Sequence, residues 1–165
     1  MNILVTGASG FVGSAVWRYF QTQAIPVRPV FRNTDSARLV GVAPEQSAIV
    51  PTLAADTDWF AALQGVQVMV HCAARAHVMR ETAVDPLAVF RAVNVEGTLN
   101  LARQAAAAGV RRFVFISSVK VNGESTMLGR SFTADDTPAP EDAYGISKAE
   151  AEAGLHAIAR KTGME

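Results

Sequence analysis

Two side chains suited to acid–base chemistry stand four residues apart near the end of the chain. Tyr144 and Lys148 fall within Tyr-Gly-Ile-Ser-Lys at the start of a predicted helix, so that both lie on one helix face. A phenol has a pKa of about 10 in model peptides, but a fixed ammonium group nearby lowers that pKa toward neutrality. The pair therefore predicts proton transfer by Tyr144, although tyrosine and lysine at this spacing are more often solvated surface residues.

Two serines, Ser117 and Ser118, follow directly after an apolar segment at 112–116 that is predicted to be a strand. In an open parallel sheet, ligands bind outside the carboxyl ends of the strands. A hydroxyl at that edge can donate a hydrogen bond to a substrate oxygen. On strand position alone, a serine pair more often just begins a loop, and the Tyr144/Lys148 pair shifts the interpretation toward function.

A glycine-rich turn near the N-terminus predicts a dinucleotide site. The apolar residues 3–6 lead into Gly7, Gly10 and Gly13, and an amphipathic helical pattern follows at once. Gly7 permits the turn, Gly10 lets the backbone approach a pyrophosphate, and Gly13 lets helix and strand pack closely. The unpaired amides and the positive dipole end of the helix would face the phosphates. Spaced glycines alone often mark only a turn, but between a strand and a helix they favour nucleotide binding.

The elements that must position these residues alternate along the chain. Strands are expected at 2–6, 26–31, 47–50, 66–71 and 112–116, and helices at roughly 11–22, 57–64, 86–108 and 143–160, with a short polar-to-apolar segment at 36–41. Strands separated by helices predict a doubly wound parallel α/β sheet with helices on both faces. The expected strand order is 3-2-1-4-5, with the nucleotide crevice between strands 1 and 4. Residues 122–142 have little periodicity and predict a long surface loop.

Composition limits the classes of protein that this chain can represent. With 165 residues it has the length of one domain, and its 15 basic and 15 acidic residues cancel, so no net field attracts nucleic acid or an anionic membrane. The single cysteine, Cys72, cannot form an internal disulfide, and no apolar run approaches the length of a membrane span. No His/Cys/Asp cluster has metal-ligand spacing, which predicts no metal. These features predict a cytoplasmic protein.

Taken together and in this order, the motifs resemble those of the short-chain dehydrogenase/reductase superfamily, specifically its extended branch of nucleotide-sugar epimerases and dehydratases. The segments that carry the resemblance are Thr6–Gly13 for the TGxxGxxG turn, His71-Cys72-Ala73-Ala74 after the fourth strand, the mid-helix Asn94, and Phe115-Ile116-Ser117-Ser118 with Tyr144-Gly-Ile-Ser-Lys148 for the catalytic serine and the YxxxK motif. Counting back from Gly123, the family pattern selects Ser118 rather than Ser117.

The resemblance implies a Rossmann-type fold that binds NAD or NADP. Tyr144 would move a proton to or from a sugar hydroxyl, Lys148 would hold the nicotinamide ribose and lower the Tyr144 pKa, and Ser118 would orient the reacting oxygen. The implied cofactor-binding residues are Gly7, Ser9, Gly10, Phe11, Val12, Gly13, Arg32, Leu53, Cys72, Ala73, Ala74, Asn94, Tyr144 and Lys148. The small-molecule substrate would be a nucleotide sugar, with no nucleic acid, membrane or metal involved.

The resemblance also implies a homodimer and a longer protein. Family members pair through the helices expected here at about 86–108 and 143–160, which should then present an exposed apolar face containing Val89, Val93, Leu101, Leu155 and Ile158. The chain ends just after Gly163, where a sixth strand should begin. Residues 1–165 are therefore expected to be a cofactor lobe, truncated before its last strands and the substrate-binding lobe, with little or no turnover.

Departures from the family pattern keep alternatives open. Arg32 follows the second strand where NAD-preferring members carry an acid, so it could meet the 2′-phosphate of NADP or be an ordinary surface arginine. Pro51-Thr52 replaces the usual Gly-Asp and loses an acceptor for the adenine amine. The alternatives are an NADPH-dependent carbonyl reductase of the same branch and a non-catalytic dinucleotide-binding sensor. His71 is interpreted as a packing residue, and His77 is expected near the mouth of the cofactor site.

Overall fold

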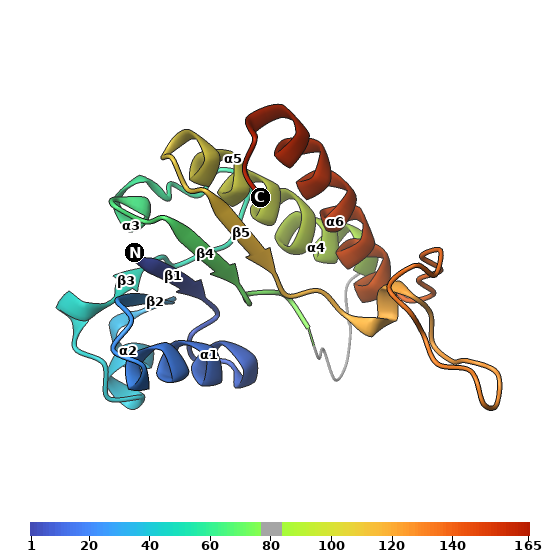
Figure 1. Cartoon of the computed structure of the whole chain (residues 1–165), viewed down its shortest axis with the longest axis horizontal. Coiled ribbons are helices and arrows are strands. Elements are labelled where there is room, and N and C mark those ends of the chain that lie inside the picture. The colour runs from blue at the N-terminus through green and yellow to red at the C-terminus, as the bar shows by residue number, and fades with distance from the viewer. Residues whose placement is uncertain (77–83) are drawn as a thin grey trace.

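A parallel five-stranded sheet forms the centre of the chain (Figure 1). The computed structural model describes residues 1–76 and 84–165. The strands are β1 (Ile3–Thr6), β2 (Val27–Phe31), β3 (Ala48–Ile49), β4 (Val68–His71) and β5 (Arg112–Phe115). Their order is β3-β2-β1-β4-β5, and every pairing is parallel. The predicted fold class and strand order are confirmed.

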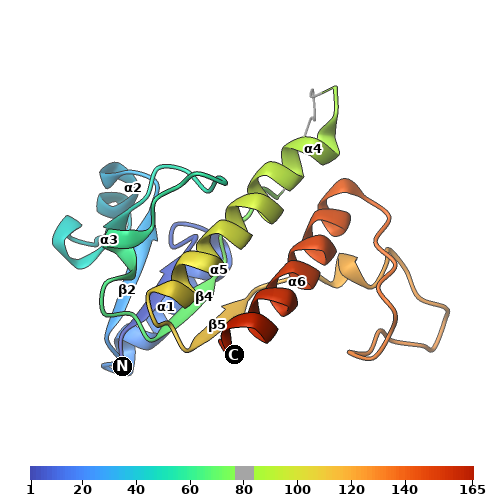
Figure 2. The same cartoon turned by 90° about the horizontal axis from the view of Figure 1, so that it is seen from above.

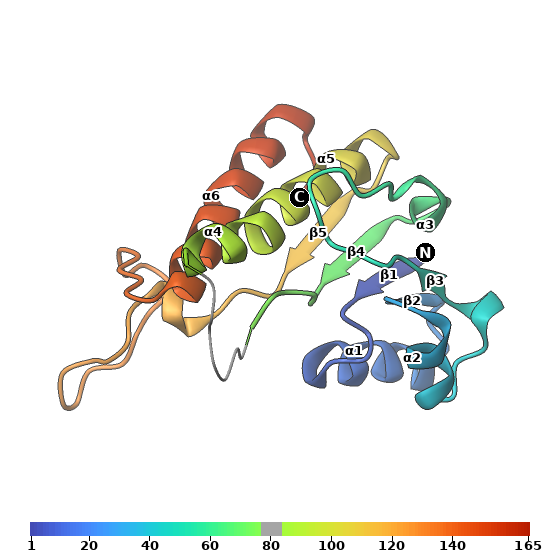
Figure 3. The ribbon, with the colours of Figure 1, turned by 180° about the vertical axis from the view of Figure 1, so that it is seen from behind.

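Side chains that alternate along the strands build two separate cores, one on each face of the sheet. Ile3 and Val5 point to the face covered by α1 (Phe11–Thr22) and α2 (Thr34–Leu39), where they pack with Trp17. Leu4 points to the opposite face and packs in a cluster with Trp59 and residues of α5 (Thr98–Ala107). Figure 3 shows the two helical layers from behind. Both faces of the sheet are therefore covered at β1, β2 and β4, whereas the outer strand β5 leaves Arg112 and Val114 exposed.

Local capping signals set the helix ends. The segment expected only as a polar-to-apolar stretch is the helix α2, because the Asn33 side chain accepts a hydrogen bond from the Ser36 amide at 2.8 Å and caps it. The Asp85 side chain caps α4 (Pro86–Arg91) in the same way, with Pro86 in the first helical position. The last helix, α6 (Ala143–Thr162), ends at Gly163, whose positive φ of 74° terminates it.

The helix predicted at 86–108 is interrupted, which corrects the expectation of one continuous α-helix. Between α4 and α5 the chain forms a π-helical segment, η2 (Ala92–Gly97). Gly97 closes this segment, and a Cβ on it would lie 2.8 Å from the backbone carbonyl of Leu53. The loop after β3 thus packs directly on the helix backbone. Such π segments are frequent at functional sites, and this one contains Asn94.

The helical stretch from α4 through η2 to α5 lies beside α6, and both cover one face of the sheet (Figure 2). They approach closely at Gly154, where an added Cβ would meet the Leu99 side chain at 2.6 Å. The predicted exposed apolar face is wrong, because Leu101 is completely buried in the core, Leu155 and Ile158 pack against that core, and Val89 and Val93 are half-buried. The core-facing side chains are buried because the apolar stripe of each helix is used within the chain.

Two further segments follow β5. The loop at 122–142 projects away from the sheet, and its base is closed by a hydrogen bond from the Ala139 amide to the Val121 carbonyl at 2.9 Å. Beyond α6, the Glu165 amide donates to the Arg111 carbonyl at 2.9 Å, and the Phe113 amide donates to the Glu165 carbonyl at 2.7 Å. Glu165 therefore continues the parallel ladder at the outer edge of β5. In the ranges that the structure describes, no helix is both long and apolar enough to cross a membrane.

Candidate functional site

The candidate residues gather at the carboxyl edge of the sheet. The glycine turn follows β1, Cys72–Ala74 follow β4, and Ser118 lies just beyond β5. Tyr144 and Lys148 belong to the first turns of α6, which is contacted by the 3-10 turn η3 (Val119–Val121) after β5. The topology therefore brings residues separated by more than a hundred positions to one side of the molecule, where open parallel sheets bind ligands.

The turn after β1 is built so that backbone can approach backbone. Gly7 has a φ of 67°, and a Cβ on it would lie 2.8 Å from the Ala73 amide nitrogen. A Cβ on Gly13 would overlap the Gly7 carbonyl, so α1 can pack against the strand end only with glycine there. Gly10 is exposed and occupies the N-cap of α1, where it presents backbone rather than a side chain. This bare helix start fits an anion such as a pyrophosphate.

The side chains next to this turn are unusually open. Phe11 is 95% exposed at the first position of α1, and Val12 and Ser9 are exposed beside it. An exposed phenylalanine at a helix start lies where a flat organic ligand could cover it. Ala73 and Ala74 are half-buried across the turn and add small apolar surface. The site thus combines exposed backbone at the start of α1 with apolar side chains beside it.

A buried polar network ties β1, β4 and α5 together and was not recognised in the sequence. The Thr6 hydroxyl accepts hydrogen bonds from the Cys72 and Ala73 amides, both at 3.2 Å. Its one proton must then go to His71 Nδ1, which is 2.7 Å away. His71 Nε2 consequently carries the ring proton and donates it to the Thr98 hydroxyl at 3.0 Å. His71 is therefore a positioning residue for the loop after β4, rather than only a packing residue.

The same network keeps His71 neutral. Complete burial is the main cause, and the positive charge of Lys148 adds to it; together they lower the pKa of His71 to about 3. A protonated ring would lose its Nδ1 acceptor and leave the Thr6 hydroxyl proton without that partner.

Asn94 holds the segment after β4 at Arg75, a few residues beyond the strand. Its side-chain oxygen accepts from the Arg75 amide at 2.8 Å, and its amide nitrogen donates to the Arg75 carbonyl and the Ser147 hydroxyl, both at 3.0 Å. Asn94 is almost fully buried, so these bonds also meet its polar requirements. The predicted cofactor residue therefore joins the π segment, the loop and α6.

Lys148 is buried beneath the site. Its ammonium donates to the Ile116 carbonyl at 2.7 Å and lies 3.7 Å from the centroid of the Phe115 ring. Only 2% of the residue is exposed, and this burial lowers the Lys148 pKa to about 8, against a small opposing effect of the Glu152 charge. An ammonium has three N–H donors, and the Ile116 carbonyl accepts one of them.

Tyr144 lies between Ser118 and Phe90, whose ring packs edge-on with a centroid distance of 6.1 Å. Partial burial has the largest effect on the Tyr144 pKa and raises it; hydrogen bonding with Ser118 and the charge of Lys120 lower it, and Asp142 raises it. The predicted lowering of the Tyr144 pKa is therefore wrong for this structure. Burial exceeds the favourable interactions, and the Lys148 ammonium is directed to Ile116 instead.

The remaining sequence-predicted positions lie farther from this centre. Arg32 is exposed just after β2, and Leu53 lies in the loop after β3, against Gly97. Thr52, which stands where an adenine acceptor was expected, uses its hydroxyl with Thr57 at 3.2 Å. His77 lies outside the described residues.

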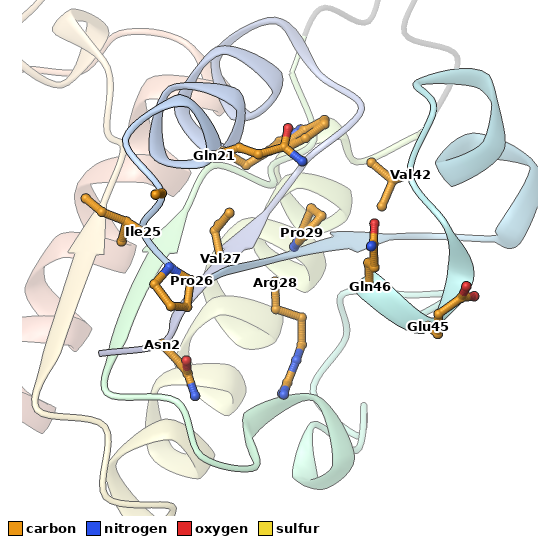
Figure 4. Close-up of a pocket in the computed structure, with 12 residues that line it drawn as sticks. Asn2, Gln21, Ile25, Pro26, Val27, Arg28, Pro29, Val42, Glu45 and Gln46 are labelled. Carbon is orange, nitrogen blue, oxygen red and sulfur yellow. The ribbon is translucent and has the colours of Figure 1, made fainter.

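A separate cleft of about 470 Å³ lies at the other end of β2 (Figure 4). Its walls include Gln21 of α1, Val27 and Pro29 of β2, and Glu45 and Gln46. The Arg28 guanidinium at its rim donates to the Ala62 and Gln64 carbonyls at 2.7 and 3.1 Å. None of the glycine-turn or α6 candidates lines this cleft, so it is distinct from the edge that carries the proposed chemistry.

Known proteins match nearly the whole of this chain. The NAD dependent epimerase/dehydratase family matches residues 3–165. The UDP-glucose 4-epimerase of Vibrio cholerae is 44% identical over 168 residues, which cover 99% of this chain and 49% of that protein.

Two solved structures share the fold at moderate identity. A short-chain dehydrogenase/reductase superfamily protein of Agrobacterium tumefaciens with bound NAD is 34% identical, with a TM-score of 0.81 over 100% of this chain and 47% of the other. The dTDP-glucose 4,6-dehydratase of Streptomyces venezuelae, with NAD and TYD bound, is 31% identical, with a TM-score of 0.79 over 99% and 53%. The chain spans about half the length of the curated relatives it matches.

The buried neutral state of His71 predicts a specific acid sensitivity. The folded chain keeps His71 unprotonated down to about pH 3, whereas the unfolded chain protonates it near its ordinary pKa of 6.5. Between these values the unfolded state binds more protons, so stability falls as pH falls, by up to about 1.4 kcal/mol per pH unit from this group.

Urea unfolding followed from about pH 7 to about pH 4.5 measures this dependence. His71→Gln should remove that part of the slope, while His156→Gln, at an exposed position of α6, should retain it. Equal slopes in all three proteins would contradict the assignment.

Proposed function

The chain belongs to the NAD dependent epimerase/dehydratase family, and from this premise we propose that residues 1–165 form the dinucleotide-binding part of a nucleotide-sugar epimerase or dehydratase. The observation that supports the proposal most is the glycine turn, in which a bare helix start follows β1 and faces the loop after β4. The first-turn amides of α1 would hold the pyrophosphate of NAD, and Lys148 would hold the ribose hydroxyls.

The chain's own residues divide the proton chemistry among them. When bound, the nicotinamide would accept and return a hydride at the sugar carbon. Tyr144 would take the proton from the hydroxyl on that carbon and give it back, and the Ser118 hydroxyl would hold the reacting oxygen by a hydrogen bond. The buried ammonium of Lys148 would favour the phenolate form once its remaining donors are shared with ligand hydroxyls.

Epimerisation is the first candidate, because the UDP-glucose 4-epimerase relative is 44% identical over nearly the whole chain. A dehydratase would begin with the same proton and hydride removal, so the residues discussed here serve both reactions. Arg32, exposed at the end of β2, favours a second candidate, an NADPH-dependent carbonyl reductase.

Dinucleotide titration tests the cofactor proposal. We expect the chain to bind NAD in calorimetry, and Gly10→Ala to weaken binding at least about tenfold, because the new Cβ would lie 3.2 Å from the Gly7 carbonyl oxygen in the phosphate cradle. Thr22→Ala, at the exposed far end of the same helix, should leave the affinity unchanged. If Arg32 binds a 2′-phosphate, Arg32→Ala should weaken NADP binding and leave NAD binding unchanged. Folded protein that binds neither dinucleotide would refute the proposal.

Catalysis should require more protein than these 165 residues. Holding reactants in near-attack geometry accounts for roughly 7–11 kcal/mol of barrier reduction, and we propose that the other half of the protein supplies most of the substrate contacts. With UDP-sugars and NAD, we therefore expect little or no epimerisation by the chain alone. Substantial turnover that disappears in Tyr144→Phe would contradict this expectation while supporting the role of Tyr144.

We also propose a homodimer formed across the outer surfaces of α4–α5 and α6. The support is that the two helices lie side by side with small exposed residues, including Ala88 and Ala153. Sedimentation velocity at micromolar concentration should give a dimer, which Ala153→Glu dissociates and Ala134→Glu, in the projecting loop, leaves intact. A folded wild-type chain that sediments only as a monomer would overturn this proposal.

A further inference from the structure

One lysine beside the candidate site joins three separate segments of the chain. Lys120, in η3, places its ammonium 2.6 Å from the Asp142 carboxylate and 2.9 Å from the Glu124 carboxylate. Asp142 is also the N-cap of α6, where its other oxygen accepts the Gly145 amide at 2.6 Å. The turn after β5, the projecting loop and the start of α6 are therefore held together through one cation.

The backbone segments on either side of this ion pair are in close contact, with no space for a side chain at Gly145. A Cβ on Gly145 would lie 2.7 Å from the Lys120 carbonyl oxygen, so η3 lies directly against the first turn of α6. The Ser118 hydroxyl accepts the Lys120 amide at 3.3 Å and caps η3. Ser118 lies two residues before Lys120 and Tyr144 two residues after Asp142, so both flank this ion pair.

We propose that Lys120 is a positioning residue for the proposed proton-transfer site: its ion pair with Asp142 fixes the Ser118 turn on α6 and balances the charge of the helix cap beside Tyr144. This inference rests on the proposed function only in assigning proton transfer to Tyr144. The packing and the charges that it concerns belong to the chain itself.

The charges around Tyr144 determine in which direction its pKa should shift when one of them is removed. Asp142 raises the pKa of the phenol and Lys120 lowers it, while burial has the largest effect and Ser118 contributes a hydrogen bond. On the opposite side, Arg75 lies over the Phe90 ring that packs against Tyr144, and Lys148 is bonded to Ile116. Glu124 acts on this group of charges through Lys120. Loss of Lys120 alone would leave the Asp142 charge unbalanced next to the phenol.

The Tyr144 hydroxyl can be titrated directly, without turnover. The chain has two tyrosines, and Tyr19 is 61% exposed, so a Tyr19→Phe background leaves Tyr144 as the single tyrosine. Carbon-13 labelling of tyrosine and NMR then follow the Tyr144 ionisation in each variant, with circular dichroism at each pH verifying that the chain is folded.

Two single variants should shift the titration in opposite directions. Lys120→Met should raise the Tyr144 midpoint and Asp142→Asn should lower it, each by about a few tenths of a pH unit, the size typical of surface ion pairs. Asparagine is also a good N-cap, so Asp142→Asn removes the charge while keeping the helix start. The double variant and Lys120→Arg should titrate close to the parent. Lys161→Met, the same substitution at the exposed far end of α6, should have no effect.

Shifts of the same sign in the two single variants would indicate a merely structural role and overturn the inference, as would the absence of a shift in both. The result is separable from the proposed function. If the two variants shift the Tyr144 titration in opposite directions but the chain binds no dinucleotide, the role of Lys120 stands and the cofactor proposal fails. If the chain binds NAD but the shifts are not opposite, the cofactor proposal stands and the role of Lys120 fails.

Discussion

Three stretches of backbone meet at Gly7 with no space for a side chain, and the rest of the site depends on that contact. The end of β1, the start of α1 at Gly13 and the loop after β4 at Ala73 approach one another at distances that any Cβ would obstruct. Gly7 also needs a positive φ, which glycine adopts without steric penalty. The contact sets the angle at which α1 leaves the sheet and therefore where its free amides point.

Buried polar groups hold the loops around this contact, together with the apolar packing of Ala8 and Cys72. Thr6, His71 and Thr98 form one chain of hydrogen bonds, and Asn94 forms a second one with Arg75 and Ser147. In a low-dielectric interior such bonds are strong, and leaving one partner unsatisfied is costly, so a fully paired network strongly favours one arrangement. The first residues after β4 are consequently held at two points, at Cys72-Ala73 and at Arg75.

Lys148 shows the energetic cost of building a charged site inside this frame. Burial of its side chain between α6 and the end of β5 lowers the Lys148 pKa to about 8, and the Ile116 carbonyl and Phe115 ring offset part of the desolvation penalty. The same positive charge opposes protonation of His71. We propose that ligand hydroxyls bind this buried ammonium, because they would replace part of its lost hydration. The charge of Lys148 thus affects both the protonation of His71 and the proposed binding of ligand hydroxyls.

The sequence by itself determined the class of fold and most element boundaries, because these follow from local signals, and the strand order followed from the glycine turn together with the alternation of strands and helices. The apolar periodicity, the glycine turn and the caps at Asp85 and Gly163 act over a few residues each. The tertiary structure alone decided the π segment at 92–97, the burial of Leu101 and the partners of His71. It also decided the direction of the Tyr144 pKa shift, which depends on burial and on Ser118, Lys120 and Asp142. These features arise from distances between residues far apart in the chain, and desolvation and Coulomb effects depend on such distances, which spacing along a sequence does not contain.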